Sequence, residues 1–140
     1  MTTTEIQDIV DAFELLGDWD MRYQYLVELG EQLPAIPAAE KVDQNRVKEC
    51  MSLVYVAARR SDLDPERLEY TGDCDTAIIK GVVALLVRIF SGKSPEEIED
   101  LDVDSLFEGL HLEEHLSPNR HVGVYAIVGK MKGQAHALAR

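Results

Sequence analysis

Apolar residues at helical spacing open the chain. They recur every three or four positions, at Ile6, Ile9, Val10, Phe13 and Leu16. Gly17 ends this first repeat, and Asp18 stands as an N-cap before a second one, which runs over 19–33 and stops at Pro34. The pattern predicts two amphipathic helices, which we expect to pack as an antiparallel pair.

The periodicity then changes to that of strands. Bulky and β-branched residues gather around Val54, and Leu68 and Tyr70 alternate with polar neighbours. Three short strands are predicted, at about 45–49, 52–60 and 66–72. A turn falls at 61–65, and no crossover helix fits between the strands, so neighbours must be antiparallel.

The second half of the chain is predicted to be helical. The stretch 76–90 is apolar nearly all round, which is typical of a central buried helix, and Asp75 precedes it as a candidate N-cap. Gly81 inside this stretch indicates a close approach of another backbone. A capping box at Ser94 and Glu97 opens a short helix. Two more helices are expected, at 102–109 and from 117 toward 138.

Helices before and after a compact antiparallel sheet predict an α+β fold of two layers. We expect a single domain over 1–140, in which a small three-stranded antiparallel sheet packs against helices.

Charge and hydropathy narrow the class of protein. The net charge is −12, and 14 Lys and Arg are diluted among 26 acids, which disfavours nucleic-acid binding and favours a basic partner surface. The longest apolar stretch, 77–90, is shorter than the roughly 20 residues that a membrane-spanning helix needs. No secretion leader opens the chain, so a cytoplasmic location is expected, and Cys50 and Cys74 are interpreted as free thiols.

The two cysteines differ in predicted position. Cys50 falls at a connection between strands, where another protein can reach a side chain. Cys74 falls just before the helix that follows Asp75, where a helix start favours a thiolate and a resolving role toward Cys50 is conceivable. A small buried residue in a strand-to-helix turn is the alternative for Cys74.

Four separated segments, in the same order, resemble the SufE family of sulfur acceptors. They are Trp19 to Pro34; Val47 to Tyr55, which contains Cys50; Gly72 to Gly81 with Ser91 to Ile98; and His115 to Arg120 with Gly123. Within the second segment, Glu49 stands where the family has glycine, Met51 where glutamine is common, and Tyr55 where tryptophan is common. Glu49 brings a Cβ into a tight loop, and its carboxylate disfavours a neighbouring thiolate.

The resemblance implies a SufE/NifU-like fold and a role in iron–sulfur cluster assembly. Cys50 would take sulfur as a persulfide from a PLP-dependent cysteine desulfurase, stimulate that enzyme, and pass the sulfur to a cluster scaffold complex. Arg120 is a second candidate site residue, to offset an acid or assist the thiolate, and Asp75 a third, for docking or helix capping. We expect no cofactor and no bound metal, no membrane or nucleic-acid partner, and a monomer or weak dimer.

Alternatives remain open at this point. Cys50 with His115 as base would make a Cys-His hydrolase, although no orienting residue or oxyanion loop is evident. Cys50 and Cys74 with a histidine, His111 or His115, would make a metal or cluster scaffold. An interaction module without sulfur transfer is the third.

Overall fold

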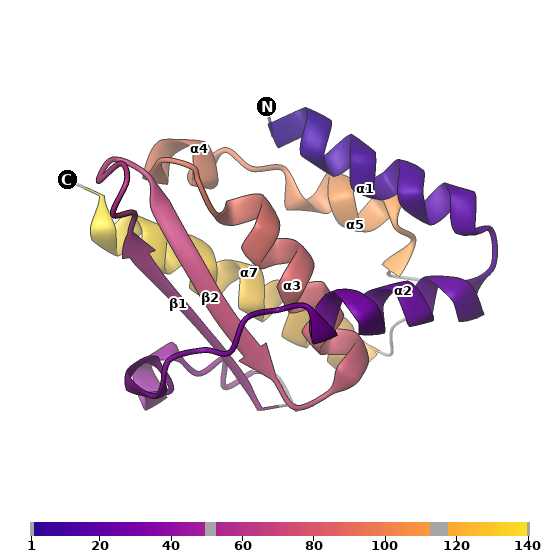
Figure 1. Ribbon diagram of the computed structural model, residues 1–140, viewed down its shortest axis with the longest axis horizontal. Helices are drawn as coiled ribbons and strands as arrows, with labels where there is room; N and C mark the ends of the chain where they lie inside the picture. The colour runs from indigo at the N-terminus through magenta and orange to yellow at the C-terminus, as the bar shows by residue number, and fades with distance from the viewer. Residues whose placement is uncertain (1, 50–52, 113–117, 140) are drawn as a thin grey trace.

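The computed structural model has an α+β fold and describes residues 2–49, 53–112 and 118–139, with backbone alone at 2–6 and 118–121 (Figure 1). Its elements, in chain order, are α1 Thr2–Leu16, α2 Trp19–Glu31, the 3₁₀ turns η1 Ala38–Glu40 and η2 Asp43–Asn45, β1 Val54–Arg60, β2 Leu68–Cys74, α3 Ala77–Phe90, α4 Pro95–Glu99, α5 Val103–Gly109 and α7 Pro118–Leu138.

The sheet of the described residues has two strands, so the prediction of three was wrong. β1 and β2 form an antiparallel hairpin whose register runs from Val54 opposite Cys74 to Arg60 opposite Leu68. The third strand, predicted at 45–49, is reduced to a single bridge between Arg46 and Tyr55. Val47 is the one buried residue of that stretch. The stretch therefore lacks the alternating apolar face that holds a strand on a sheet.

One face of the hairpin carries the core. The Tyr70 hydroxyl donates to the Met131 carbonyl of α7 at 2.7 Å, and the Tyr70 ring meets Phe90 of α3 edge to face at 5.5 Å. Since one side chain contacts both helices, α3 and α7 cover the same face of the sheet, as the ribbon shows (Figure 1). The result is a two-layer arrangement with a small sheet against helices.

Glycines let α2 and α3 approach closely, as the sequence predicted for Gly81. A Cβ at Gly81 would lie 2.1 Å from the Leu26 carbonyl oxygen, and one at Gly30 would lie 3.0 Å from the Gly81 nitrogen. The helix pair therefore packs backbone to backbone. This contact fixes the start of α3, and with it the end of the sheet where β2 finishes and β1 begins.

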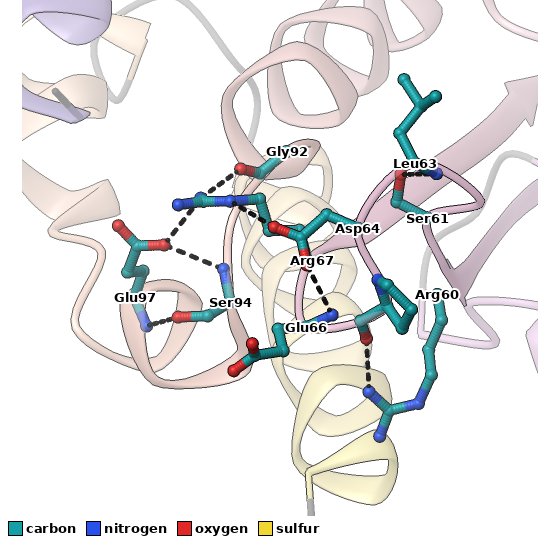
Figure 2. Close-up of polar contacts among 10 residues, drawn as sticks. Arg60, Ser61, Leu63, Asp64, Glu66, Arg67, Gly92, Ser94 and Glu97 are labelled. Atoms are coloured by element: carbon teal, nitrogen blue, oxygen red, sulfur yellow. Dashed lines mark hydrogen bonds and ion pairs between the residues drawn. The ribbon is translucent and has the colours of Figure 1, made fainter.

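Polar contacts stiffen the opposite end of the hairpin (Figure 2). Arg67 pairs with Asp64 in the turn at 3.4 Å and with Glu97 of α4 at 3.2 Å, and it donates to the Gly92 carbonyl at 2.8 Å. The predicted capping box of Ser94 and Glu97 is present. Leu63, at the tip of the turn, is 98% exposed.

None of the described helices combines the length and apolar character that a bilayer crossing requires.

Candidate functional site

The residues on both sides of Cys50 are held at fixed points. We call residues 48–53 the cysteine segment; Cys50 itself, with 51 and 52, lies outside the described residues. Before the segment, the Val47 amide donates to the Val54 carbonyl at 2.9 Å, and Arg46 bridges to Tyr55. Val47 and Val54, the residues that border the cysteine segment, are therefore hydrogen-bonded to each other.

Asp75 anchors the far side of the cysteine segment. Its Oδ1 accepts the Leu53 amide at 2.9 Å, and its own amide donates to the Leu53 carbonyl at 3.3 Å. The capping role predicted for Asp75 was wrong, because Thr76 is the N-cap of α3 and makes no side-chain cap bond. A carboxylate that accepts a backbone amide makes a charge-assisted hydrogen bond. Asp75 therefore ties the start of α3 to the cysteine segment.

Asp73, two residues earlier in β2, carries an ion-pair cluster. Its carboxylate lies 3.1 Å from the Lys41 ammonium and 3.5 Å from that of Lys80. Partial burial acts to raise the pKa of Asp73, but hydrogen bonds from Lys41 and the Cys74 amide, with the charges of Lys41 and Lys80, outweigh it and lower the pKa. The cluster ties β2 to α3 and to the chain between η1 and η2 on this side of the site.

Cys74 faces the core. It is 5% exposed, pairs with Val54 in the sheet, and its Sγ accepts the Thr76 amide at 3.4 Å. This environment suits a small residue in a strand-to-helix turn. The resolving role toward Cys50 stays a prediction.

An open hollow adjoins the near side of the cysteine segment. It has a volume of about 410 Å³ between the chain at 43–49 and one face of α7. Its lining residues are Asp43, Gln44, Arg46, Lys48, Glu49, Ala126, Gly129 and Lys130. Sequence reasoning missed it because its two walls lie about 80 positions apart and neither carries a motif. We call it the Lys130 hollow.

One internal ion pair forms at the rim of the Lys130 hollow. The Lys48 ammonium lies 3.0 Å from the Asp43 carboxylate, and both side chains are exposed. The pKa of Asp43 is lowered, first by the Lys48 hydrogen bond and charge, and further by the charges of Arg46 and Lys130. Both of these other cations therefore lie within electrostatic range of Asp43.

Glu49 is exposed and sits in a turn. Of the described non-glycine residues only His111 has a positive φ, of 56°, so the backbone at Glu49 does not adopt the left-handed conformation that favours glycine. The departure from the family glycine therefore requires no backbone strain at this position.

The remaining candidates are only partly described. Arg120 lies in the first turn of α7, as predicted, where the structure describes the backbone alone. His115 also lies outside, so the hydrolase pair with Cys50 is not part of the described chain. His111 is exposed. Across 2–49, 53–112 and 118–139, no three His, Cys, Asp or Glu side chains gather where they could hold a metal ion.

Comparison with known sequences points to one family. The family model described as "SufE: Fe-S metabolism associated domain" matches residues 7–135. An uncharacterized SufE-like protein of Rhizobium meliloti (strain 1021) is 35% identical over 133 residues, which cover 94% of this chain and 95% of the relative. An uncharacterized SufE-like protein of Rhizobium etli is also 35% identical, over 136 residues, covering 96% of this chain and 91% of the relative.

The fold also has a counterpart among solved structures. The solution structure of a hypothetical protein from Thermus thermophilus superposes with a TM-score of 0.76 and covers 96% of this chain and 95% of its own. Because the two sequences are 23% identical, this likeness concerns the fold alone.

Proposed function

The chain belongs to the SufE family, whose domain is associated with Fe–S metabolism, and we propose that it is a sulfur acceptor that carries persulfide sulfur on Cys50. The donor is a PLP-dependent cysteine desulfurase, which holds the sulfur of its substrate cysteine as a persulfide on its own cysteine. The chain stimulates the desulfurase by removing that sulfur and passes it on to the assembly of iron–sulfur clusters.

The transfer is a nucleophilic exchange at sulfur. The Cys50 thiolate attacks the outer sulfur of the desulfurase persulfide, a new S–S bond forms to Cys50, and the old S–S bond breaks. The desulfurase cysteine leaves as a thiolate, which takes up the proton that the Cys50 thiol lost. One persulfide is consumed and one is formed, so no external oxidant or reductant is needed.

The observation that carries the proposal is the double anchoring of the cysteine segment. Its first end is fixed by the Val47 to Val54 hydrogen bond and its last by the reciprocal contacts of Leu53 with Asp75. A short connection held at both ends limits the conformations that a thiol within it can adopt, which lowers the entropic cost of presenting it to a second protein. Val47 and Val54, which form the first anchor, are buried core residues.

Charge around the segment also supports the proposal. Among the described residues, five of the 14 Lys and Arg of the chain, but only four of its 26 acids, lie beside the two ends of the segment: Lys41, Arg46, Lys48, Lys80 and Lys130 against Asp43, Glu49, Asp73 and Asp75. In a protein of net charge −12, this raises the local potential relative to the rest of the surface. A less negative potential favours a thiolate over a thiol, which acts against the opposing effect of Glu49.

Mass spectrometry tests the proposal. The chain is incubated with a cysteine desulfurase and cysteine, and the peptide that contains Cys50 is expected to gain about 32 Da, the mass of one sulfur atom, which a reductant then removes. The Cys74→Ser variant is the matched control and should gain the same mass.

Two results would contradict the proposal. One is a Cys50 peptide that never gains sulfur although the desulfurase turns over in the same tube. The other is co-purified iron or zinc that Cys50→Ser abolishes, which would favour the scaffold alternative.

A further inference from the structure

Two cations of the Lys130 hollow have no partner of opposite charge in direct contact among the described residues. Within those ranges, neither the Arg46 guanidinium nor the Lys130 ammonium makes a hydrogen bond or an ion pair. Lys48 is paired with Asp43 across the rim. After that pair is set aside, the lining retains two cations against Glu49, on a protein whose acids outnumber its Lys and Arg by 26 to 14.

The Lys130 hollow is lined by the residue that directly precedes Cys50 in the chain. Glu49 lines the hollow, and the Cα of the next residue along a chain lies about 3.8 Å away across a trans peptide. In the transfer proposed above, the outer sulfur of the desulfurase persulfide must come within bonding distance of the Cys50 sulfur, about 2 Å. Specific complexes bury about 800 Å² on each partner, a patch roughly 30 Å across, and we expect a patch of that size around Cys50 to include the hollow.

Covering the hollow removes water from Arg46 and Lys130. A cation that loses its hydration without a countercharge is strongly unfavourable, and the loss is recovered only by a well-placed anion. The hollow, of about 410 Å³, is large enough to admit the side chains of a short acidic stretch. Gly129 adds to this access, because a Cβ there would meet nothing within 4 Å.

We infer that the Lys130 hollow is a subsite for Asp or Glu carboxylates of the cysteine desulfurase that loads Cys50, with Arg46 and Lys130 as the residues that select for them. The inference rests on the proposed function. It adds a partner-specificity determinant outside the cysteine segment, built from residues of two distant parts of the chain. Lys48 and Asp43, which pair with each other, complete the charged lining.

Charge reversal tests the subsite. The double variant Arg46→Glu, Lys130→Glu is compared with the matched double variant Arg59→Glu, Arg88→Glu, which changes the net charge equally at exposed positions away from the hollow. Dissociation constants with the desulfurase are measured at low and high salt, together with the rate of sulfur loading on Cys50. Far-UV circular dichroism confirms that each variant is folded.

We expect the hollow variant to bind the desulfurase about tenfold more weakly at low salt, and the control to stay within about threefold of the parent. The difference should shrink at high salt because screening weakens exposed charge pairs. The neutral variant Arg46→Gln, Lys130→Gln should fall between the parent and the charge-reversed protein. A Glu→Lys change on the desulfurase that restores binding to Lys130→Glu would identify the carboxylate.

The outcomes separate the subsite from the proposed function. If the parent loads sulfur and the hollow variant binds and loads equally well, the subsite is refuted and the sulfur-acceptor function stands. If hollow and control variants weaken binding equally, the effect is one of net charge, and the subsite is again refuted. If the parent never loads sulfur, the proposed function fails and the subsite falls with it.

Discussion

Replacement of Asp75 by alanine should loosen the cysteine segment without disturbing the core. Asp75 is exposed, and its carboxylate is the side-chain acceptor for the Leu53 amide, at 2.9 Å. Asp75→Ala removes that acceptor and leaves the backbone contact between the Asp75 amide and the Leu53 carbonyl, at 3.3 Å. The end of the segment nearest β1 then has one anchor in place of two.

The magnitude follows from the geometry. Hydrogen bonds to charged groups contribute about 1.5 to 3 kcal/mol, but water competes at this exposed site, so about 1 kcal/mol is expected. For a chain of 140 residues, this lowers the melting temperature by about 3 °C. The same 1 kcal/mol, lost from the conformation that presents Cys50, reduces the equilibrium constant for that conformation about fivefold.

Thermal unfolding and single-turnover sulfur loading measure the two effects. Asp75→Asn is the matched control, because its amide oxygen still accepts the Leu53 amide, and it should retain most of both the stability and the loading rate. The reasoning is refuted if Asp75→Ala melts and loads as the parent does. It is also refuted if Asp75→Asn is as impaired as Asp75→Ala, since the charge and not the hydrogen bond would then be responsible.

Three further predictions concern the frame that holds the site. Gly81→Ala should destabilise the fold by about 3 kcal/mol, because its Cβ would lie 2.1 Å from the Leu26 carbonyl oxygen. Gly133→Ala, whose Cβ would meet nothing within 4 Å, should instead stabilise α7 by about 0.5 to 1 kcal/mol. Urea unfolding measures both variants, and equal effects would contradict the packing of α2 on α3. Tyr70→Phe should cost about 1 kcal/mol in the same assay through loss of the 2.7 Å hydrogen bond to Met131, and an unchanged midpoint would show that this bond contributes nothing. Asp73→Asn should make the free energy of unfolding fall less steeply as the pH is lowered. Despite burial, the lysines hold the pKa of Asp73 in the folded protein below its usual 3.8. The stabilisation from the Asp73 carboxylate is therefore present above pH 3.8 and is lost as the pH falls through the lower folded pKa. Unfolding curves between about pH 5 and 2.5 that superpose for parent and variant would contradict this ion-pair cluster.

Local signals predicted most of the helices. The side chain of the N-cap residue Asp18 accepts a hydrogen bond from the Met21 amide at 2.9 Å, and Ser94 and Glu97 form their capping box, because caps and periodicity act within a few residues. The glycine at position 81 was also informative, since a glycine within an apolar helix has few uses other than close packing.

The errors arose where distant contacts outweigh local preference. Val47 is drawn back to Val54, so the predicted strand at 45–49 pairs at one point and then turns away. Asp75 is a good N-cap residue in isolation, yet its carboxylate accepts a hydrogen bond from the Leu53 amide, 22 positions earlier in the chain, and does not cap the helix.

The candidate site was predictable only in part. Cys50 was identified from its place at a strand connection and from the resemblance to the SufE family, and its role stays a prediction. Asp75 was named for docking or helix capping; it contacts Leu53 at the end of the cysteine segment, and its docking role stays a prediction. The Lys130 hollow requires the packing of α7 beside the chain at 43–49, which no local pattern encodes. Its cations, Arg46 and Lys130, look like ordinary solvated residues in the sequence.

The most direct measurement follows radiolabelled sulfur through a single turnover. A desulfurase loaded with labelled persulfide, and freed of excess cysteine, is mixed with the parent chain, Cys50→Ser or Cys74→Ser. Label should move to the parent and to Cys74→Ser and should stay on the desulfurase with Cys50→Ser. Transfer of label to Cys50→Ser at the parental rate would contradict the assignment of Cys50 as the sulfur carrier.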